Sequence, residues 1–139
     1  MLSIEEQIAQ MKRGVIDLIN EAELTAKLKL GRPLRVKYGA DPSAPDLHLG
    51  HCVQLRALRR MQDFGHHIIF IVGDFTAMIG DPSGRSATRP QLSREQVRAN
   101  AETYAQQASL ILDMSKTELR YNSEWLSELK SEDMIRIAG

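Results

Sequence analysis

Three consecutive segments decide the fold: residues 34–38 read LRVKY, residues 49–64 read LGHCVQLRALRRMQDF, and residues 68–72 read IIFIV. The first alternates apolar and polar side chains, which is typical of a strand, and Gly39 ends it. The second repeats apolar residues every three or four positions, so it predicts a helix that ends at Gly65. The third is an unbroken β-branched and aromatic run, which predicts a strand covered on both faces. A strand, a helix and a buried strand in this order predict a βαβ unit with a parallel sheet.

Helical periodicity also marks the residues before this unit. Apolar side chains recur every three or four positions from Ile4 to Ala22, behind a capping box of Ser3 and Glu6. Asn20 predicts the start of a second helical series. The buried side of the 49–64 helix is expected to carry Val53, Leu55, Leu58, Met61 and Phe64.

Further elements follow the unit. Ser93 and Gln96 form a second capping box and predict a helix. Its expected buried positions are Val97, Ala101, Tyr104, Ala108, Ile111 and Leu112. Residues 119–122 predict a third strand, and a last helix is expected from Ser131.

The composition of the chain is typical of an ordinary globular domain. The chain has 139 residues, of which 42% are hydrophobic and 26% charged, a balance typical of globular proteins. Eighteen basic and eighteen acidic residues cancel, so a nucleic-acid partner would have to be met by a local patch or by residues outside this chain. The single cysteine, Cys52, fits a reducing cytoplasmic compartment. Glu5 and Glu6 interrupt the apolar pattern of residues 1–10, so we expect neither a signal peptide nor a membrane span.

Both predicted strands of the βαβ unit run into loops rich in Gly, Asp and Pro, at 39–46 and 73–84. Ligands of open parallel sheets bind beyond the carboxyl ends of the strands. We therefore expect the two loops to lie along one ligand-binding edge.

The first candidate site is His48-Leu49-Gly50-His51 at the start of the 49–64 helix. A helix N-terminus attracts phosphate, and residues three apart lie on one side of the first turn. Gly50 lets a base or a phosphate approach the backbone. Binding of a nucleoside triphosphate is the functional interpretation. Ordinary surface histidines and a metal pair without its other ligands are the alternatives.

The second candidate site is the 73–84 loop together with the arginines that follow it. Asp81 could accept hydrogen bonds from an ammonium group, while Arg85 and Arg89 could bind phosphate or carboxylate. An ordinary turn with solvated arginines is the alternative. The sequence contains neither a P-loop nor a G-x-G-x-x-G motif, and His66 and His67 are expected to be structural.

Taken in order, residues 36–51 (VKYGADPSAPDLHLGH) and 72–84 (VGDFTAMIGDPSG) resemble bacterial tyrosyl-tRNA synthetases. Residues 48–51 look like the "HIGH" signature of class I synthetases, and 80–84 resemble a segment typical of the tyrosine enzymes. The resemblance extends to about Trp125. It implies an α/β, Rossmann-like (HUP-type) nucleotide-binding fold that is incomplete in 34–139, behind an N-terminal helical segment at 1–33.

The resemblance also implies roles for individual residues. His48 and His51 would be catalytic, stabilising charge on the ATP phosphates. The other expected ATP-binding residues are Ser43, Gly50, Arg85 and Arg89. The expected tyrosine-binding residues are Gly39, Asp41, Thr76, Asp81 and Lys37. ATP would be a substrate accompanied by Mg²⁺, with no metal site in the protein itself. L-tyrosine and tRNA(Tyr) would be the other substrates. The full-length enzyme would be a homodimer that contacts no membrane.

Two departures from the family pattern stand out. Lys37 occupies a position where many members have a tyrosine that contacts the substrate phenol, and Tyr38 beside it should lie on the opposite strand face. The second signature, the "KMSKS" loop, has no counterpart, because Lys116 lies in the wrong place. We therefore expect an N-terminal part of a longer enzyme, with little or no activity alone. Another HIGH-motif nucleotidyltransferase and a non-catalytic nucleotide-binding paralogue are the alternatives.

Overall fold

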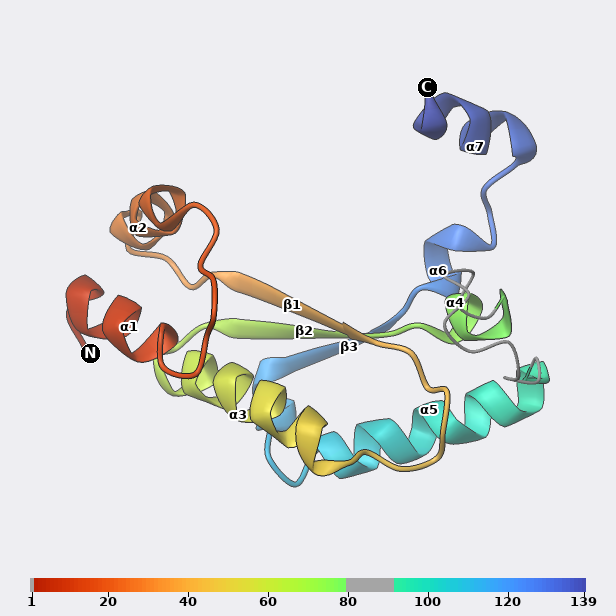
Figure 1. Cartoon of the computed structure of the whole chain (residues 1–139), viewed down its shortest axis with the longest axis horizontal. Helices are drawn as coiled ribbons and strands as arrows, with labels where there is room; N and C mark the ends of the chain where they lie inside the picture. Colours follow the sequence, from red (N-terminus) through yellow and green to blue (C-terminus); the bar gives the residue numbers. More distant parts are fainter. Residues whose placement is uncertain (1, 80–91) are drawn as a thin grey trace.

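The computed structural model describes residues 2–79 and 92–139, and a parallel sheet with the order β1-β2-β3 runs through their centre (Figure 1). The elements in chain order are α1 Ile4–Met11, α2 Glu21–Lys29, β1 Arg35–Ala40, α3 Leu49–Asp63, β2 His67–Val72, α4 Asp74–Ile79, α5 Arg94–Ala108, a 3-10 turn η1 Met114–Lys116, β3 Thr117–Tyr121, α6 Ser123–Leu126 and α7 Ser131–Ala138.

The predicted βαβ unit is confirmed. β1 pairs with β2 in parallel from Arg35 opposite His67 to Ala40 opposite Val72, and α3 is the crossover helix. β3 adds in parallel on the other side of β2. The first strand extends through Gly39, where the sequence predicted its end.

The core lies on one face of the sheet, where α3 and α5 pack (Figure 1). Ile68, Phe70 and Val72 of β2 point into it and are buried. Other buried members come from the two helices and the turn after α5: Leu55, Leu58, Ala101, Ala108 and Leu112. Val97 and Tyr104 are buried as predicted, while Ile111 is half-buried.

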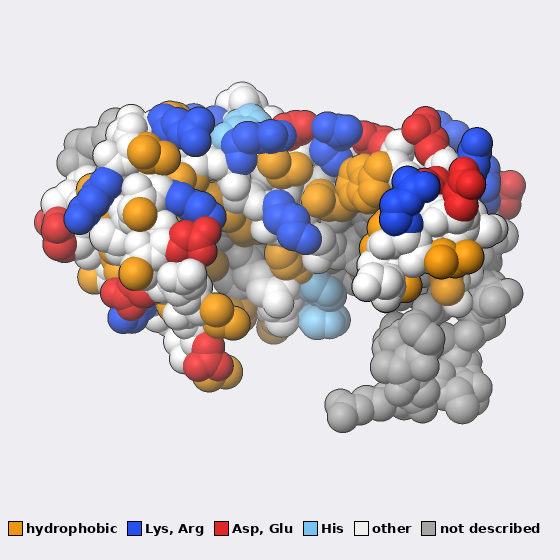
Figure 2. Space-filling model, turned by 90° about the horizontal axis from the view of Figure 1, so that it is seen from above, with side chains coloured by type: hydrophobic (Ala, Val, Ile, Leu, Met, Phe, Trp, Pro, Cys, Tyr) orange, Lys and Arg blue, Asp and Glu red, His pale blue; other side chains and the backbone are white. Residues whose placement is uncertain are grey.

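The expectation that β2 is covered on both faces is wrong within the described residues. Ile69 and Ile71 are only half-buried, because α3 and α5 lie on the opposite face. Figure 2 looks onto the less covered side, where hydrophobic side chains gather near the middle and Lys and Arg side chains follow one rim. Glu118 of β3 receives a 2.9 Å hydrogen bond from Arg35 of β1 on this face.

The expected buried stripe of α3 needs a correction. Leu55 and Leu58 are buried, but Met61 and Phe64 are half-buried and Val53 is 63% exposed. Val53 lies about 200° around the helix from Leu55, so both cannot face the sheet. Gln62, one turn beyond Leu58, takes the buried position instead and is 1% exposed.

The predicted first helix also stops earlier than expected. α1 ends at Met11, and Gly14 has a left-handed backbone with φ of 80°. Ile16 is consequently 98% exposed. The second helical series starts at Asn20 as predicted, where the side chain caps α2 by accepting from the N–H of Glu23.

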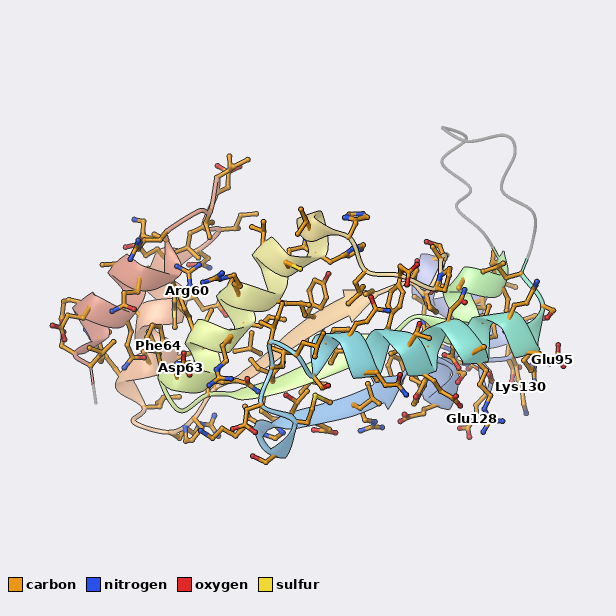
Figure 3. All side chains as sticks on the ribbon, turned by 90° about the horizontal axis from the view of Figure 1, so that it is seen from below. Arg60, Asp63, Phe64, Glu95, Glu128 and Lys130 are labelled. Atoms are coloured by element: carbon orange, nitrogen blue, oxygen red, sulfur yellow. The ribbon has the colours of Figure 1, made fainter. Side chains whose placement is uncertain are left out.

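α1 is fastened to the βαβ unit by one arginine of α3. The guanidinium of Arg60 donates to the carbonyls of Gln10 and Arg13, both at 3.0 Å. Figure 3 shows Arg60, Asp63 and Phe64 at the end of α3 nearest α1. The helix end of α1 therefore receives donors from a different element.

The carboxyl-terminal elements follow the predictions closely. β3 begins at Thr117, two residues earlier than expected, and α7 begins at Ser131 as expected. Met134, Ile135 and Ile137 of α7 are exposed. Across residues 2–79 and 92–139, none of the helices has the length and apolar character that crossing a membrane requires.

Candidate active site

Backbone hydrogen bonds join the carboxyl ends of the three strands. The N–H of Gly73, just after β2, donates to the carbonyl of Ala40 at 2.9 Å. The N–H of Asn122, just after β3, donates to the carbonyl of Val72 at 3.0 Å. The prediction that the loops after β1 and β2 share one edge is confirmed for the part that the structure describes. Residues 74–79, expected in a loop, form α4, and the N–H of Ala77 donates to the Gly73 carbonyl at 2.9 Å in its first turn.

A carboxylate and a hydroxyl meet over Gly73. The hydroxyl of Thr76 in α4 donates to Asp41 Oδ1 at 2.7 Å. A β-carbon on residue 73 would lie 1.8 Å from this Oδ1 and 2.6 Å from Thr76 Oγ1. Only glycine leaves room for this contact, so Gly73 sets the position of the Asp41 carboxylate.

Three polar residues of this edge were missed by the sequence reasoning. Asn122 is buried and its Nδ2 donates to Thr76 Oγ1 at 3.0 Å. Asp74 accepts at Oδ1 from the N–H of Ser123 at 2.9 Å and at Oδ2 from its hydroxyl at 2.6 Å. One signal could have found them, because a polar residue comes within two positions of the end of each strand: Asp41 after β1, Asp74 after β2 and Asn122 after β3.

A small pocket of about 200 Å³ opens beside these residues. This is less than the roughly 300–1,000 Å³ of drug-sized sites, so it suits a small ligand or one part of a larger one. Lys37 and Asp41 supply one positive and one negative charge. The complete lining is Lys37, Gly39, Ala40, Asp41, Ile71, Gly73, Asn122, Trp125 and Leu126.

Lys37 and Tyr38 lie on opposite faces of β1, as the alternation predicted. Lys37 lines the pocket, whereas Tyr38 packs against Phe70 in the core with ring centroids 5.6 Å apart. The Tyr38 hydroxyl donates to Gln54 of α3. Burial and the nearby Tyr104 raise the pKa of Tyr38, which keeps the phenol neutral.

The two histidines of residues 48–51 stack at the start of α3, with ring centroids 4.0 Å apart. His48 Nδ1 accepts from the N–H of Gly50 at 3.1 Å, and His51 Nδ1 accepts from the N–H of His48 at 3.2 Å. A neutral imidazole that accepts at Nδ1 carries its proton on Nε2. Both rings therefore keep an Nε2–H donor for a ligand.

Neighbouring groups fix the two rings. Tyr104 of α5 meets His51 edge-on at a centroid distance of 6.2 Å. A β-carbon on residue 50 would approach the His48 ring to 2.9 Å, so Gly50 also makes room for the histidine that caps its N–H.

α5 fastens the loop that carries Asp41, Ser43 and the helix start. Asn100 donates to the carbonyl of Pro42 at 3.0 Å, and Gln107 accepts from the N–H of Leu47 at 2.8 Å. Ser43 is exposed on this loop, and its N–H donates to the Asp41 carbonyl at 2.8 Å. The predicted residues Asp81, Arg85 and Arg89, and the 80–84 segment, lie outside the described residues.

His66 lies away from this edge, whereas a second, larger cavity borders it. His66 is buried at the amino end of β2, where Nδ1 accepts from the N–H of Leu34 at 3.3 Å and burial lowers the pKa of the imidazole. The larger cavity, of about 510 Å³, lies between α4, α5 and α6 and is lined in part by Asp74 and Ser123, and none of the described residues that line it is a predicted site residue. In residues 2–79 and 92–139, no three His, Cys, Asp or Glu side chains gather in a way that could hold a metal ion.

A family model and the sequences of known proteins both match this chain to the same family of enzymes. The family described as tRNA synthetases class I (W and Y) matches residues 29–139. Tyrosine–tRNA ligase 2 of Vibrio vulnificus is 62% identical over 139 residues, which are 100% of this chain and 35% of that protein. Tyrosine–tRNA ligase of Photobacterium profundum is 59% identical over the same shares. The chain thus spans about a third of the length of the curated relatives it matches.

Solved structures agree on the fold. Tyrosyl-tRNA synthetase of Archaeoglobus fulgidus, crystallised with L-tyrosine, superposes with a TM-score of 0.79 at 21% identity over 99% of this chain and 40% of its own. The enzyme from Aeropyrum pernix gives 0.77 at 20% identity, over 99% of this chain and 40% of its own. The fold is thus the Rossmann-like fold of class I tyrosyl-tRNA synthetases. By the match over 29–139, the chain belongs to the class I tRNA synthetases of the tryptophan and tyrosine group.

Proposed function

We propose that the chain carries part of the active site of a tyrosine–tRNA ligase, which activates L-tyrosine with ATP and transfers it to tRNA(Tyr). The supporting observation is the pairing of two Nε2–H donors at the start of α3 with a small pocket lined by Lys37 and Asp41. In this proposal residues 34–139 form the first part of the catalytic domain, behind a helical segment at 1–33.

The first step joins the tyrosine carboxylate to ATP. A carboxylate oxygen attacks the α-phosphorus, and the bond from that phosphorus to the departing pyrophosphate breaks. Negative charge develops on the phosphate oxygens, where donors fixed in advance stabilise the transition state. We assign this role to His48 and His51, whose Nδ1 atoms are held by backbone N–H groups.

The pocket receives the amino acid in this proposal. A free amino acid carries one ammonium and one carboxylate, and Lys37 and Asp41 provide one charge of each sign. Gly39, Thr76 and Asp81 complete the tyrosine site, while Ser43, Gly50, Arg85 and Arg89 serve ATP. In the second step the ribose hydroxyl of tRNA attacks the activated carbonyl and releases AMP.

The remaining assignments concern the complete gene product. Mg²⁺ prefers phosphate oxygens and water, so it would enter with ATP. Contacts to tRNA would come mainly from residues beyond the 139 of this sequence. We also propose a homodimer that acts in the cytoplasm without contacting a membrane.

Tyrosine-dependent exchange of pyrophosphate into ATP tests this function in the complete gene product. His48→Asn keeps an acceptor for the N–H of Gly50 but replaces the imidazole donor. We expect His48→Asn and His51→Ala each to lower the exchange rate by roughly 10²–10³-fold, the effect of losing one donor to a developing charge. Tyrosine affinity should change by no more than about twofold, because these donors act on the phosphates.

His67→Asn serves as the control, since His67 lies at the opposite end of the sheet on β2. Full exchange activity in a His48→Asn, His51→Ala double variant would contradict the mechanism. Adenylylation of a substrate that is not an amino acid would favour another HIGH-motif nucleotidyltransferase. ATP binding without exchange would favour a non-catalytic paralogue.

A further inference from the structure

We infer that Asn122 is a positioning residue for the amino-acid substrate, because it acts through the Thr76 hydroxyl to fix the direction of the Asp41 carboxylate. The inference rests on the proposed function, since it assumes that this carboxylate meets the substrate ammonium, a contact that the sequence also predicts for Asp81. It assigns a role in substrate discrimination to a residue at the end of β3.

The amide of Asn122 has one available orientation. Asn122 is 8% exposed, and its Oδ1 accepts from the N–H of Phe75 at 2.9 Å. A reversed amide would point its NH₂ group at that N–H and lose the bond. Nδ2 is therefore directed at Thr76 Oγ1, 3.0 Å away.

The donor from Asn122 determines what the Thr76 hydroxyl can do. A hydroxyl has a single proton to donate, and here it receives a hydrogen bond from Nδ2. Its own proton is then free for Asp41 Oδ1 at 2.7 Å, in preference to the Gly73 carbonyl at 3.2 Å. A hydrogen bond to a carboxylate is stronger than one to a neutral carbonyl.

One oxygen of Asp41 is thus fixed and the other is left for a ligand. Oδ1 sits over Gly73, in space that a β-carbon would fill. Within residues 2–79 and 92–139, no Lys, Arg or His forms an ion pair with Asp41, and Oδ2 has no hydrogen-bond partner. Asp74 is hydrogen-bonded to Ser123 and lines the larger cavity. Among the described residues, Asp41 is therefore the carboxylate that the 200 Å³ pocket presents to a substrate cation.

The experiment compares L-tyrosine with 3-(4-hydroxyphenyl)propionate, which is tyrosine without its amino group. Equilibrium dissociation constants of both are measured with the complete gene product. Asn122→Leu keeps the side chain's size and adds no charge to the pocket, but it removes the Nδ2 donor. The Thr76 hydroxyl then loses the hydrogen bond that directs its proton to Asp41, and we expect the preference for tyrosine over the analogue to fall roughly tenfold.

Thr76→Val should cause the same loss, and the Asn122→Leu, Thr76→Val double variant should lose no more than either single variant. Thr76→Ser keeps the hydroxyl and should retain the preference. Asn20→Leu is the matched control, because it makes the same replacement at the cap of α2, at the other end of the sheet. A structural defect would weaken both ligands alike and leave the preference unchanged.

The outcomes separate this inference from the proposed function. If the wild-type protein binds no tyrosine and shows no tyrosine-dependent exchange, the proposed function fails, and the inference fails with it. If the wild type does both but Asn122→Leu and Thr76→Val keep or increase the preference for tyrosine, the inference alone is overturned. Should Asn122→Leu fail to fold in urea-unfolding controls, Thr76→Val and Thr76→Ser decide the result.

Discussion

A β-carbon on residue 73 has no space in this structure, whereas one on residue 39 would lie 3.9 Å from its nearest neighbour, the Ile71 carbonyl. Gly73→Ala should therefore displace Asp41 and Thr76 and lower the free energy of unfolding by about 1–3 kcal/mol. Gly39→Ala should fold normally but obstruct the pocket. Urea unfolding and tyrosine binding measured on both variants check this prediction, and equal stability of the two would contradict it.

The burial of His66 makes stability depend on pH. Burial lowers the pKa of His66 in the folded chain, so the neutral form is favoured there. As the pH falls below the ordinary histidine pKa of about 6.5, the unfolded chain takes up a proton that the folded chain does not. The free energy of unfolding should fall as the pH is lowered from about 7.5 to about 5.5.

His66→Gln keeps an acceptor for the N–H of Leu34 and should make this fall shallower. His67→Gln is the neighbouring control, and it should retain the fall because His66 is intact. Urea unfolding at the two pH values measures both effects. Identical pH dependence of wild type and His66→Gln would argue against His66 as the source.

Arg60 joins two elements through two hydrogen bonds, so its effect belongs to the packing of α1 on α3. Arg60→Met keeps the apolar stem but leaves the carbonyls of Gln10 and Arg13 without their donors. We expect a loss of about 1–3 kcal/mol in urea unfolding. Arg56→Met, on the exposed side of α3, should change stability by less than about 0.5 kcal/mol. Equal effects of the two would refute the assignment.

Gln62 connects α3 with the segment that leads into β3. Its Nε2 donates to the Asp113 carbonyl at 2.9 Å and to Thr117 Oγ1 at 2.8 Å, and its Oε1 accepts from the N–H of Asp113 at 2.9 Å. Gln62→Leu fits the space but leaves the backbone of Asp113 and the hydroxyl of Thr117 without these hydrogen bonds. We expect a loss of roughly 2–4 kcal/mol by urea unfolding, against little change for the exposed Gln106→Leu.

The elements that sequence predicts well are those whose signals are local. Ser3 with Glu6 and Ser93 with Gln96 are three residues apart, and both capping boxes form. Contacts between residues far apart in the sequence leave no comparable local pattern. Asn122 meets Thr76 across 46 positions, and Gln62 is buried only because Asp113 and Thr117 receive its amide. The prediction for residues 12–19 is wrong because helical spacing of apolar residues cannot reveal the left-handed turn at Gly14.

For the molecule as a whole, the distribution of apolar side chains is uneven. α7 exposes Met134, Ile135 and Ile137, and the less covered sheet face carries Ile69 and Ile71. Exposed apolar patches bind other apolar surfaces. The 139-residue chain alone should therefore bind the dye ANS while folded. Ile135→Glu with Ile137→Glu should lower its fluorescence and leave the unfolding free energy within about 0.5 kcal/mol, and unchanged fluorescence would contradict this.

The cap that His48 provides for α3 has a consequence for which substitutions the gene could accumulate without losing the fold. Asn, Asp and Ser cap helices at least as well as His, so the fold would survive their appearance at residue 48. Gly73 has no such substitutes, because any side chain enters the space of Asp41. A copy of the gene freed from selection for catalysis would thus keep the fold when residue 48 changes, whereas a change at residue 73 would lower the stability of the fold.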